Sequence, residues 1–188
     1  MIRRAGFRLL WVLLLLGLGG TATAAPWRAD PRASTLEFEA YYQGQAAPGR
    51  FREFEVLLEL GPGGREPERL EVTVALASFD MGSREILDAV RAPEWLDLTR
   101  FPTARFVSDD IRRQGASCVA RGRLRLKGIE REVTAPFEWE RGNDAGRLRG
   151  ATVIDRTAFD VGTGEWASDD PIGLEIRIAY DVRLVPAQ

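Results

Sequence analysis

The chain has 188 residues, of which 45% are hydrophobic and 29% are charged, a balance typical of one globular domain rather than of a disordered or fibrous protein. The net charge of −2, with arginines interleaved among glutamates, disfavours a nucleic-acid binder, which normally carries a concentrated basic face. Histidine is absent, which excludes Ser-His-Asp and Cys-His catalysis and zinc sites built on imidazole.

Residues 1–24 predict a secretory signal peptide. Three arginines give a positive start, residues 9–18 are almost wholly apolar, and Ala22-Thr23-Ala24 offers small residues for cleavage after Ala24. The alternative is a membrane anchor, but this apolar run is shorter than the roughly 20 residues that a spanning helix needs. Cleavage would remove three arginines and no acidic residue, so the net charge would fall from −2 to −5. We therefore expect an exported protein with one domain over residues 25–188.

The first part of this domain predicts strands separated by turns. In chain order, we expect a lead-in segment at 27–31, an alternating strand at 34–42, a turn-rich break at 44–49, a longer strand from 50 to 60, a Gly-Pro loop at 61–64 and a strand at 70–76.

The period then changes to that of a helix over 84–91. Ser83 can cap this helix, and Ile86, Leu87 and Val90 are spaced to form one buried face. Since it is the best helix in a strand-rich chain, we expect it to lie across a barrel mouth or a sheet edge. It would serve there either as a gate or simply as edge cover.

The clearest pattern is a β-hairpin over 122–137, turning at Lys127-Gly128. On its first arm, Arg123 and Arg125 can face Glu130 and Glu132 on the second, which would help to set the register. Cys118 lies just before this arm on the inward register. As the single cysteine of the chain it cannot form an internal disulfide, and we expect a small buried side chain rather than a reactive thiol.

The remaining segments continue the same pattern. We expect a strand at 104–108, a connection at 111–117, a loop at 142–146, a strand at 148–154, a packed irregular loop at 156–170 and a last, long strand at 174–184. These make about eight mostly antiparallel strands with one helical insertion and no βαβ rhythm. The fold class is therefore all-β, either an up-and-down barrel or a sandwich.

Several landmarks, taken in order, resemble the YceI-like, polyisoprenoid-binding family of exported bacterial proteins. They are Trp27-x-x-Asp30, Ser34-x-Leu36-x-Phe38, Gly49-Arg50-Phe51-Arg52-Glu53-Phe54, Ser78, Trp95-Leu96-Asp97, Phe101-Pro102-x-Ala104-x-Phe106-x-Ser108, Gly122-x-Leu124-x-Leu126-Lys127-Gly128 and Arg156-x-x-Phe159-x-Val161-Gly162. No single piece is specific, but the ordered set covers nearly the whole domain.

The resemblance implies an extended, lipocalin-like antiparallel β-barrel that holds an isoprenoid-like or other long lipid chain. It also implies a periplasmic location, no catalytic residues, and for some relatives an association with cytochrome b561-type membrane electron-transfer partners. Two departures concern the ligand head group. The usual histidine positions are filled by Arg32 or Ala33 and by Lys127, and the segment after Gly162 is lengthened and includes Trp166.

The inward faces of the predicted strands supply the candidate ligand site. Small residues at Ala40, Ala104, Ala120, Gly122 and Gly150 leave room inside, so the interior is either a cavity or a solid core, and the resemblance favours a cavity. The predicted ligand-binding residues are Phe38, Phe54, Leu76, Phe106, Leu124, Ile154, Arg156, Phe159, Ile176 and Ile178.

Arg156 has a separate role in this prediction. It follows an apolar strand, so we expect it either to anchor a ligand head group at the mouth or to pair with an internal carboxylate such as that of Asp160. If it is an anchor, replacing Arg156 by alanine would weaken lipid retention without unfolding the protein.

Three functions follow from the sequence. The first is a non-enzymatic periplasmic carrier of an isoprenoid-like lipid, without a cofactor or metal, as a monomer or a homodimer. The second is a filled barrel that partners a membrane electron-transfer protein. The third is a hydrolase that uses a loop carboxylate pair, Glu165 with Asp169 or Asp170, as in glycoside hydrolysis.

Overall fold

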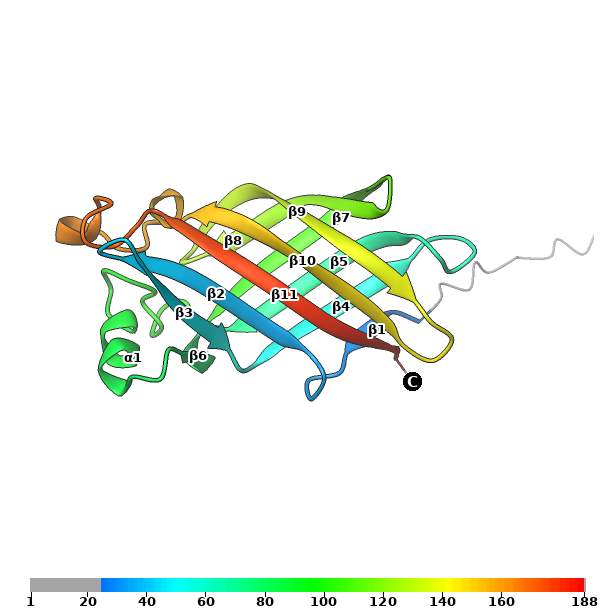
Figure 1. Ribbon diagram of the computed structural model, residues 1–188, viewed down its shortest axis with the longest axis horizontal. Coiled ribbons are helices and arrows are strands. Elements are labelled where there is room, and N and C mark those ends of the chain that lie inside the picture. The colour runs from blue at the N-terminus through cyan, green and yellow to red at the C-terminus, as the bar shows by residue number, and fades with distance from the viewer. Residues whose placement is uncertain (1–24, 188) are drawn as a thin grey trace, which may run out of the picture.

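The computed structural model describes residues 25–187, which form an antiparallel β-barrel with one short α-helix (Figure 1). The strands are β1 (Trp27–Ala29), β2 (Thr35–Tyr42), β3 (Gln45–Phe51), β4 (Phe54–Leu60), β5 (Pro67–Ala75), β6 (Phe79–Asp80), β7 (Thr103–Gln114), β8 (Ser117–Leu126), β9 (Ile129–Arg141), β10 (Gly146–Asp155) and β11 (Glu175–Pro186). The helices are α1 (Arg84–Val90) and three 3₁₀ turns, η1 (Leu76–Ser78), η2 (Arg156–Phe159) and η3 (Gly164–Trp166). The predicted signal peptide lies outside the described residues.

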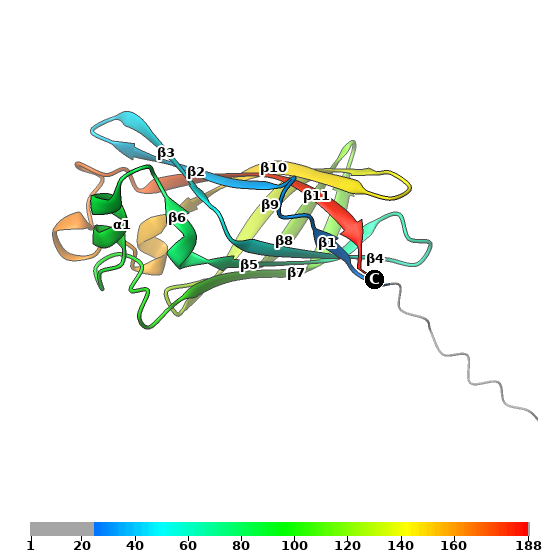
Figure 2. The same ribbon diagram turned by 90° about the horizontal axis from the view of Figure 1, so that it is seen from below.

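Eight of these strands close into a ring in the order β1-β4-β5-β7-β8-β9-β10-β11, and β1 pairs with β11 to complete it. This confirms the predicted barrel of about eight strands and excludes the sandwich. Strands β2, β3 and β6 extend the sheet from β11. The seam between β11 and β4 is therefore covered by β1 at one end and by β2, β3 and β6 at the other (Figure 2).

Three segments predicted as irregular are strands. The lead-in contains β1, which is too short to show alternation but pairs on both sides. The break at 44–49 is β3, where Pro48 is tolerated because β6 pairs with only the last two residues of this strand, leaving Pro48 at an open edge. The connection at 111–117 is mostly β7, which continues past a bulge between Val107 and Asp110 with exposed, charged side chains.

The central hairpin and the helix form as predicted. Residues Lys127 and Gly128 both take positive φ, 48° and 78°, in the two-residue turn, and Arg123 and Arg125 lie opposite Glu132 and Glu130. The Ser83 side chain accepts a hydrogen bond from the Ile86 N–H at 3.3 Å and caps α1. The expectation that this helix buries one face is wrong, because none of its residues is buried.

The interior is packed at one end of the barrel. Trp27 and Trp139 meet edge to face with ring centroids 5.7 Å apart, and Cys118 is buried beside Phe137 in the same cluster. A second cluster, around Leu76, Leu96 and Phe159, forms where η1, η2 and the chain after α1 come together. The end that carries β1 and the C-terminus is thus closed, while α1 and the loop of η2 and η3 lie at the opposite end (Figures 1 and 2).

Glycines on the inner face make room for aromatic rings on neighbouring strands. A Cβ on Gly122 would overlap Phe106, and one on Gly150 would overlap the ring of Tyr180 and the carbonyl oxygen of Pro136. The prediction that these two glycines leave empty space is therefore wrong, because neighbouring atoms fill it. Of the five small residues predicted to do so, Ala40 and Ala104 line the cavity described below.

Replacing Gly150 by alanine is expected to lower the free energy of unfolding by about 1–3 kcal/mol, because the added methyl group must displace backbone as well as the Tyr180 ring. Urea-induced unfolding would measure this loss. The matched control is Gly61→Ala after β4, where φ is not left-handed and the nearest atom to the added methyl group would belong to the flexible Glu68 side chain, at 3.3 Å. Equal losses in both variants would contradict the overlap as the cause.

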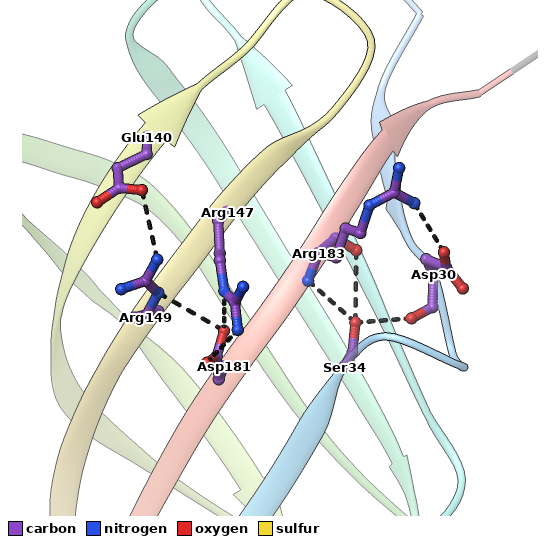
Figure 3. A network of polar contacts seen from close by, with 7 residues as sticks. All are labelled: Asp30, Ser34, Glu140, Arg147, Arg149, Asp181 and Arg183. Carbon is purple, nitrogen blue, oxygen red and sulfur yellow. Dashed lines mark hydrogen bonds and ion pairs between the residues drawn. The ribbon is translucent and has the colours of Figure 1, made fainter.

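A polar network on the outer face ties the N-terminal turn and β10 to β11 (Figure 3). Arg147 donates two hydrogen bonds to Asp181, at 2.6 and 2.7 Å, and these bonds hold the pKa of that carboxyl below its usual range. The Ser34 hydroxyl accepts from the Arg183 N–H at 3.0 Å and donates to the Asp30 carbonyl at 2.7 Å. The solvent-exposed ion pairs contribute little stability, but the Ser34 contacts fix where the first strands meet β11.

Candidate functional site

A cavity of about 600 Å³ occupies the barrel and is lined by residues of both core clusters and of α1. Its volume lies within the range of pockets that hold a small or elongated molecule. The walls are almost wholly apolar and come from the inward residues of the strands. The solid core that the sequence left open as an alternative is therefore not what this barrel contains.

Nine of the ten predicted ligand-binding residues line this cavity. They are Phe38, Phe54, Leu76, Phe106, Leu124, Ile154, Arg156, Ile176 and Ile178. Phe159 is the exception, because η2 turns its ring into the second core cluster, where it is 2% exposed. The structure thus assembles the predicted wall and places Phe159 behind it.

The two hydroxyl groups in the strand wall are already hydrogen-bonded. The Tyr180 hydroxyl donates to the Pro136 carbonyl at 2.7 Å, and the Thr152 hydroxyl donates to the Thr134 carbonyl at 2.8 Å. Among residues 25–187, no buried side-chain nitrogen or oxygen lacks a partner. Directional recognition inside the cavity is therefore weak, and the chemistry available there is burial of hydrocarbon.

Arg156 is 2% exposed, and all five of its N–H groups donate to backbone carbonyls. These carbonyls belong to Gly173, Val161, Gly162, Ser168 and Ile172, at 2.7 to 3.2 Å. The guanidinium also lies 5.7 Å from the ring centroid of Trp95. No N–H is left for a ligand head group, and the partners are carbonyls instead of the Asp160 carboxylate that the sequence suggested. Arg156 therefore holds the loop of residues 160–173 in place.

Lys127 also holds the start of the loop of residues 160–173. Its ammonium group donates to the Asp160 carbonyl at 2.6 Å, which joins the β8–β9 turn to the end of η2. Burial lowers the pKa of Lys127, and the neighbouring Asp160 carboxylate partly opposes this. Lys127 therefore has a structural contact with the loop that follows η2.

The open end of the cavity contains residues that the sequence did not identify as site residues. Trp95 and Trp166 pack with ring centroids 5.7 Å apart, and both line the cavity. The β2–β3 hairpin adds Tyr41 and Tyr42, and α1 adds Ile86. Of the apolar face that helical spacing indicated for α1, Ile86 and Val90 line the cavity and Leu87 does not. No local pattern brings Trp95 and Trp166 together. The hypothesis that α1 lies across a barrel mouth is therefore confirmed, whereas gating remains a prediction.

The carboxylates considered for hydrolysis lie in the loop around η3. Glu165, Asp169 and Asp170 are all exposed and do not line the cavity. No three Cys, Asp or Glu side chains of the described range gather in a way that could hold a metal ion. Within residues 25–187, no helix has the length and apolarity needed to cross a membrane.

Burial raises the pKa of Tyr180 above its usual value of about 10, since the phenolate would lose its hydration at the cavity wall. Below pH 10 both the folded and unfolded states keep this proton. Above it the unfolded state loses the proton first, so stability should fall as the pH rises beyond 10. Thermal unfolding between pH 8 and 11 would show this fall. Tyr180→Phe should flatten it, and an unchanged alkaline slope would contradict the assignment.

Comparison with known proteins places this barrel among relatives. The sequence model of a protein family, the YceI-like domain, matches residues 27–184 of this chain. The YceI protein of Salmonella arizonae is 26% identical over 123 residues, which cover 64% of each chain, slightly less than two thirds of that relative.

Two solved structures share the architecture. BcnA of Burkholderia cenocepacia superposes with a TM-score of 0.77 at 27% identity, covering 82% of this chain and 98% of that one. A polyisoprenoid-binding domain of Saccharophagus degradans, implicated in plant cell wall breakdown, gives a TM-score of 0.68 at 11% identity, covering 88% and 99%. The matched family model spans the whole ring from β1 to β11. The chain therefore belongs to the YceI-like family.

Proposed function

We propose that this protein binds and carries a long-chain apolar molecule of isoprenoid-like character in its barrel, without catalysing a reaction on it. The observation that carries this proposal is the cavity of about 600 Å³ with its apolar wall. Burial of hydrocarbon stabilises a complex by roughly 0.8 kcal/mol per CH₂ group, so a chain of several isoprene units gains ample affinity. Selectivity then rests on the length and shape of the chain.

The position of the polar end of such a ligand follows from the same wall. Arg156, Tyr180 and Thr152 offer no free donor, so a charged head group inside the cavity would lose its hydration without compensation. The hydrocarbon tail would enter first, and a head group would stay in water near α1. The description of the Saccharophagus degradans domain as polyisoprenoid-binding supports this class of ligand.

We place the protein in the periplasm, after removal of residues 1–24 as a signal peptide. The support is the sequence pattern of that segment, with a basic start, an apolar stretch and small residues before Pro26. A membrane electron-transfer protein as the partner and a monomeric or dimeric state stay predictions of the sequence.

Native mass spectrometry of protein purified from its own bacterium, followed by organic extraction, tests the proposed function. We expect a mass in excess of the polypeptide that disappears on extraction and yields a long-chain lipid. Ligand-free protein offered polyprenyl chains of increasing length should bind them until the cavity is filled. Repeated failure to find or load any such chain would contradict the proposal.

A further inference from the structure

The mouth of the cavity exposes apolar side chains to solvent. Tyr41, Tyr42 and Ile86 are 42%, 51% and 40% exposed, and all three line the cavity. The other large hydrophobic residue of the described range that is this exposed is Val153, on β10, which does not line it. We call Tyr41, Tyr42 and Ile86 the mouth surface. Its apolar character is continuous with that of the cavity.

The β2–β3 hairpin, which carries Tyr41 and Tyr42 of the mouth surface, is fixed in place. The Gln43 N–H donates to the Pro171 carbonyl at 2.7 Å, and the Gly173 N–H donates to the Tyr41 carbonyl at 2.8 Å. These bonds hold the β2–β3 hairpin against the loop that Arg156 organises. Helix α1, the hairpin and this loop lie together at one end of the barrel, away from β1 and the C-terminus (Figures 1 and 2). This end can therefore meet a flat surface without interference from either terminus of the domain.

The side chains of this end suit the boundary between lipid and water. Tyrosine and tryptophan concentrate at membrane interfaces, because one part of each side chain is apolar and another is polar. Here Tyr41 and Tyr42 stand at the rim, while the half-buried pair Trp95 and Trp166 lines the cavity behind it.

The charges around the mouth select the kind of lipid. Helix α1 with its C-cap and residues 164–171 together hold five acidic residues and two arginines, which are Glu85, Asp88, Glu165, Asp169, Asp170, Arg84 and Arg91. This excess of carboxylates would be repelled by an anionic bilayer surface. A zwitterionic bilayer surface carries no net charge and so does not repel these carboxylates.

We propose that the mouth surface docks on a bilayer of zwitterionic phospholipid, so that an apolar chain passes between membrane and cavity without crossing water. This inference rests on the proposed function, because it assigns to the cavity mouth the source of the ligand. The rim side chains enter the interface, and the exposed carboxylates stay hydrated beside it.

Sedimentation of lipid-free protein with vesicles of phosphatidylethanolamine and phosphatidylcholine tests the docking. We expect binding that falls about tenfold or more in the Tyr42→Ser, Ile86→Ser double variant and weakens when phosphatidylglycerol is added. Val153→Ser is the matched control and should bind as the unchanged protein does. Ile86→Trp should bind more tightly, which guards against a variant that is merely misfolded.

Lack of vesicle binding would overturn the docking, as would binding that increases with anionic lipid or falls equally in the Val153→Ser control. The proposed function is tested separately, by loading a polyprenyl chain from detergent. Loading without vesicle binding would refute the docking and leave the carrier function standing. Vesicle binding without loading would refute the carrier function, and with it the purpose that we assign to the docking.

Discussion

Replacing both Val74 and Val133 by tryptophan is expected to lower the amount of lipid bound to the purified protein at least tenfold. Both valines line the cavity from its inner wall, on β5 and β9, and both are only half-buried because they face the empty interior. Two indole rings would occupy the space that a hydrocarbon chain needs. Each CH₂ group kept out removes roughly 0.8 kcal/mol of binding free energy.

The same double variant should keep or gain stability, because the added rings fill an existing cavity instead of crowding a packed core. Native mass spectrometry and thermal unfolding would measure the two effects side by side. Val153→Trp is the matched control, since that side chain is 53% exposed on the outer face of β10 and should leave lipid binding unchanged. A double variant that holds as much lipid as the original protein would contradict the cavity as the binding site.

The strands that could be predicted from sequence are those with one solvent-exposed face and one buried face. In β8 and β11 the alternation runs for ten residues or more, so both the strand and its inward side are clear. Shorter or more charged segments gave no such signal. Strand β1 has three residues, β3 contains Pro48 at an open edge, and the outer half of β7 follows a bulge. Each is a strand only because a neighbouring strand supplies its backbone partners.

The wall of the cavity could be predicted for the same reason, but its mouth could not. Inward alternation identified residues such as Phe38 and Ile178, whose position follows from the strand alone. Trp95 and Trp166 meet only because two loops, 71 residues apart in the chain, fold over the same end. Their packing depends on tertiary contacts that no local period records.

The landmarks shared with the family are mostly structural, which explains why they predicted the fold better than the ligand. Ser34 fixes the first strands against β11, and the Ser78 hydroxyl donates to the Ala75 carbonyl at 2.6 Å while accepting from the Glu53 N–H at 3.0 Å. Asp97 is buried at a turn with positive φ, 49°. These residues specify how the barrel closes, whereas the cavity is lined by ordinary apolar side chains that many barrels could share.

Replacing Arg156 by alanine is expected to lower the free energy of unfolding by about 3 kcal/mol or more and to loosen the loop of residues 160–173. Removing the guanidinium leaves five carbonyls without donors in a site that is closed to solvent, and each buried unpaired group costs about 1–3 kcal/mol unless water reaches it. Urea-induced unfolding would measure the global loss, and limited proteolysis would detect opening of the loop.

This expectation reverses the one drawn from sequence, in which Arg156→Ala weakens lipid retention but spares the fold. Arg149→Ala is the matched control. Arg149 is exposed and makes only loose ion pairs, at 3.4 Å to Glu140 and 3.8 Å to Asp181, so its loss should change stability by less than about 0.5 kcal/mol. The loss of stability in Arg156→Lys should lie between the losses in Arg156→Ala and Arg149→Ala, because one ammonium group can satisfy at most three of the five carbonyls. If Arg156→Ala kept full stability and a protease-resistant loop while losing lipid, the head-group role would be restored and the structural one rejected.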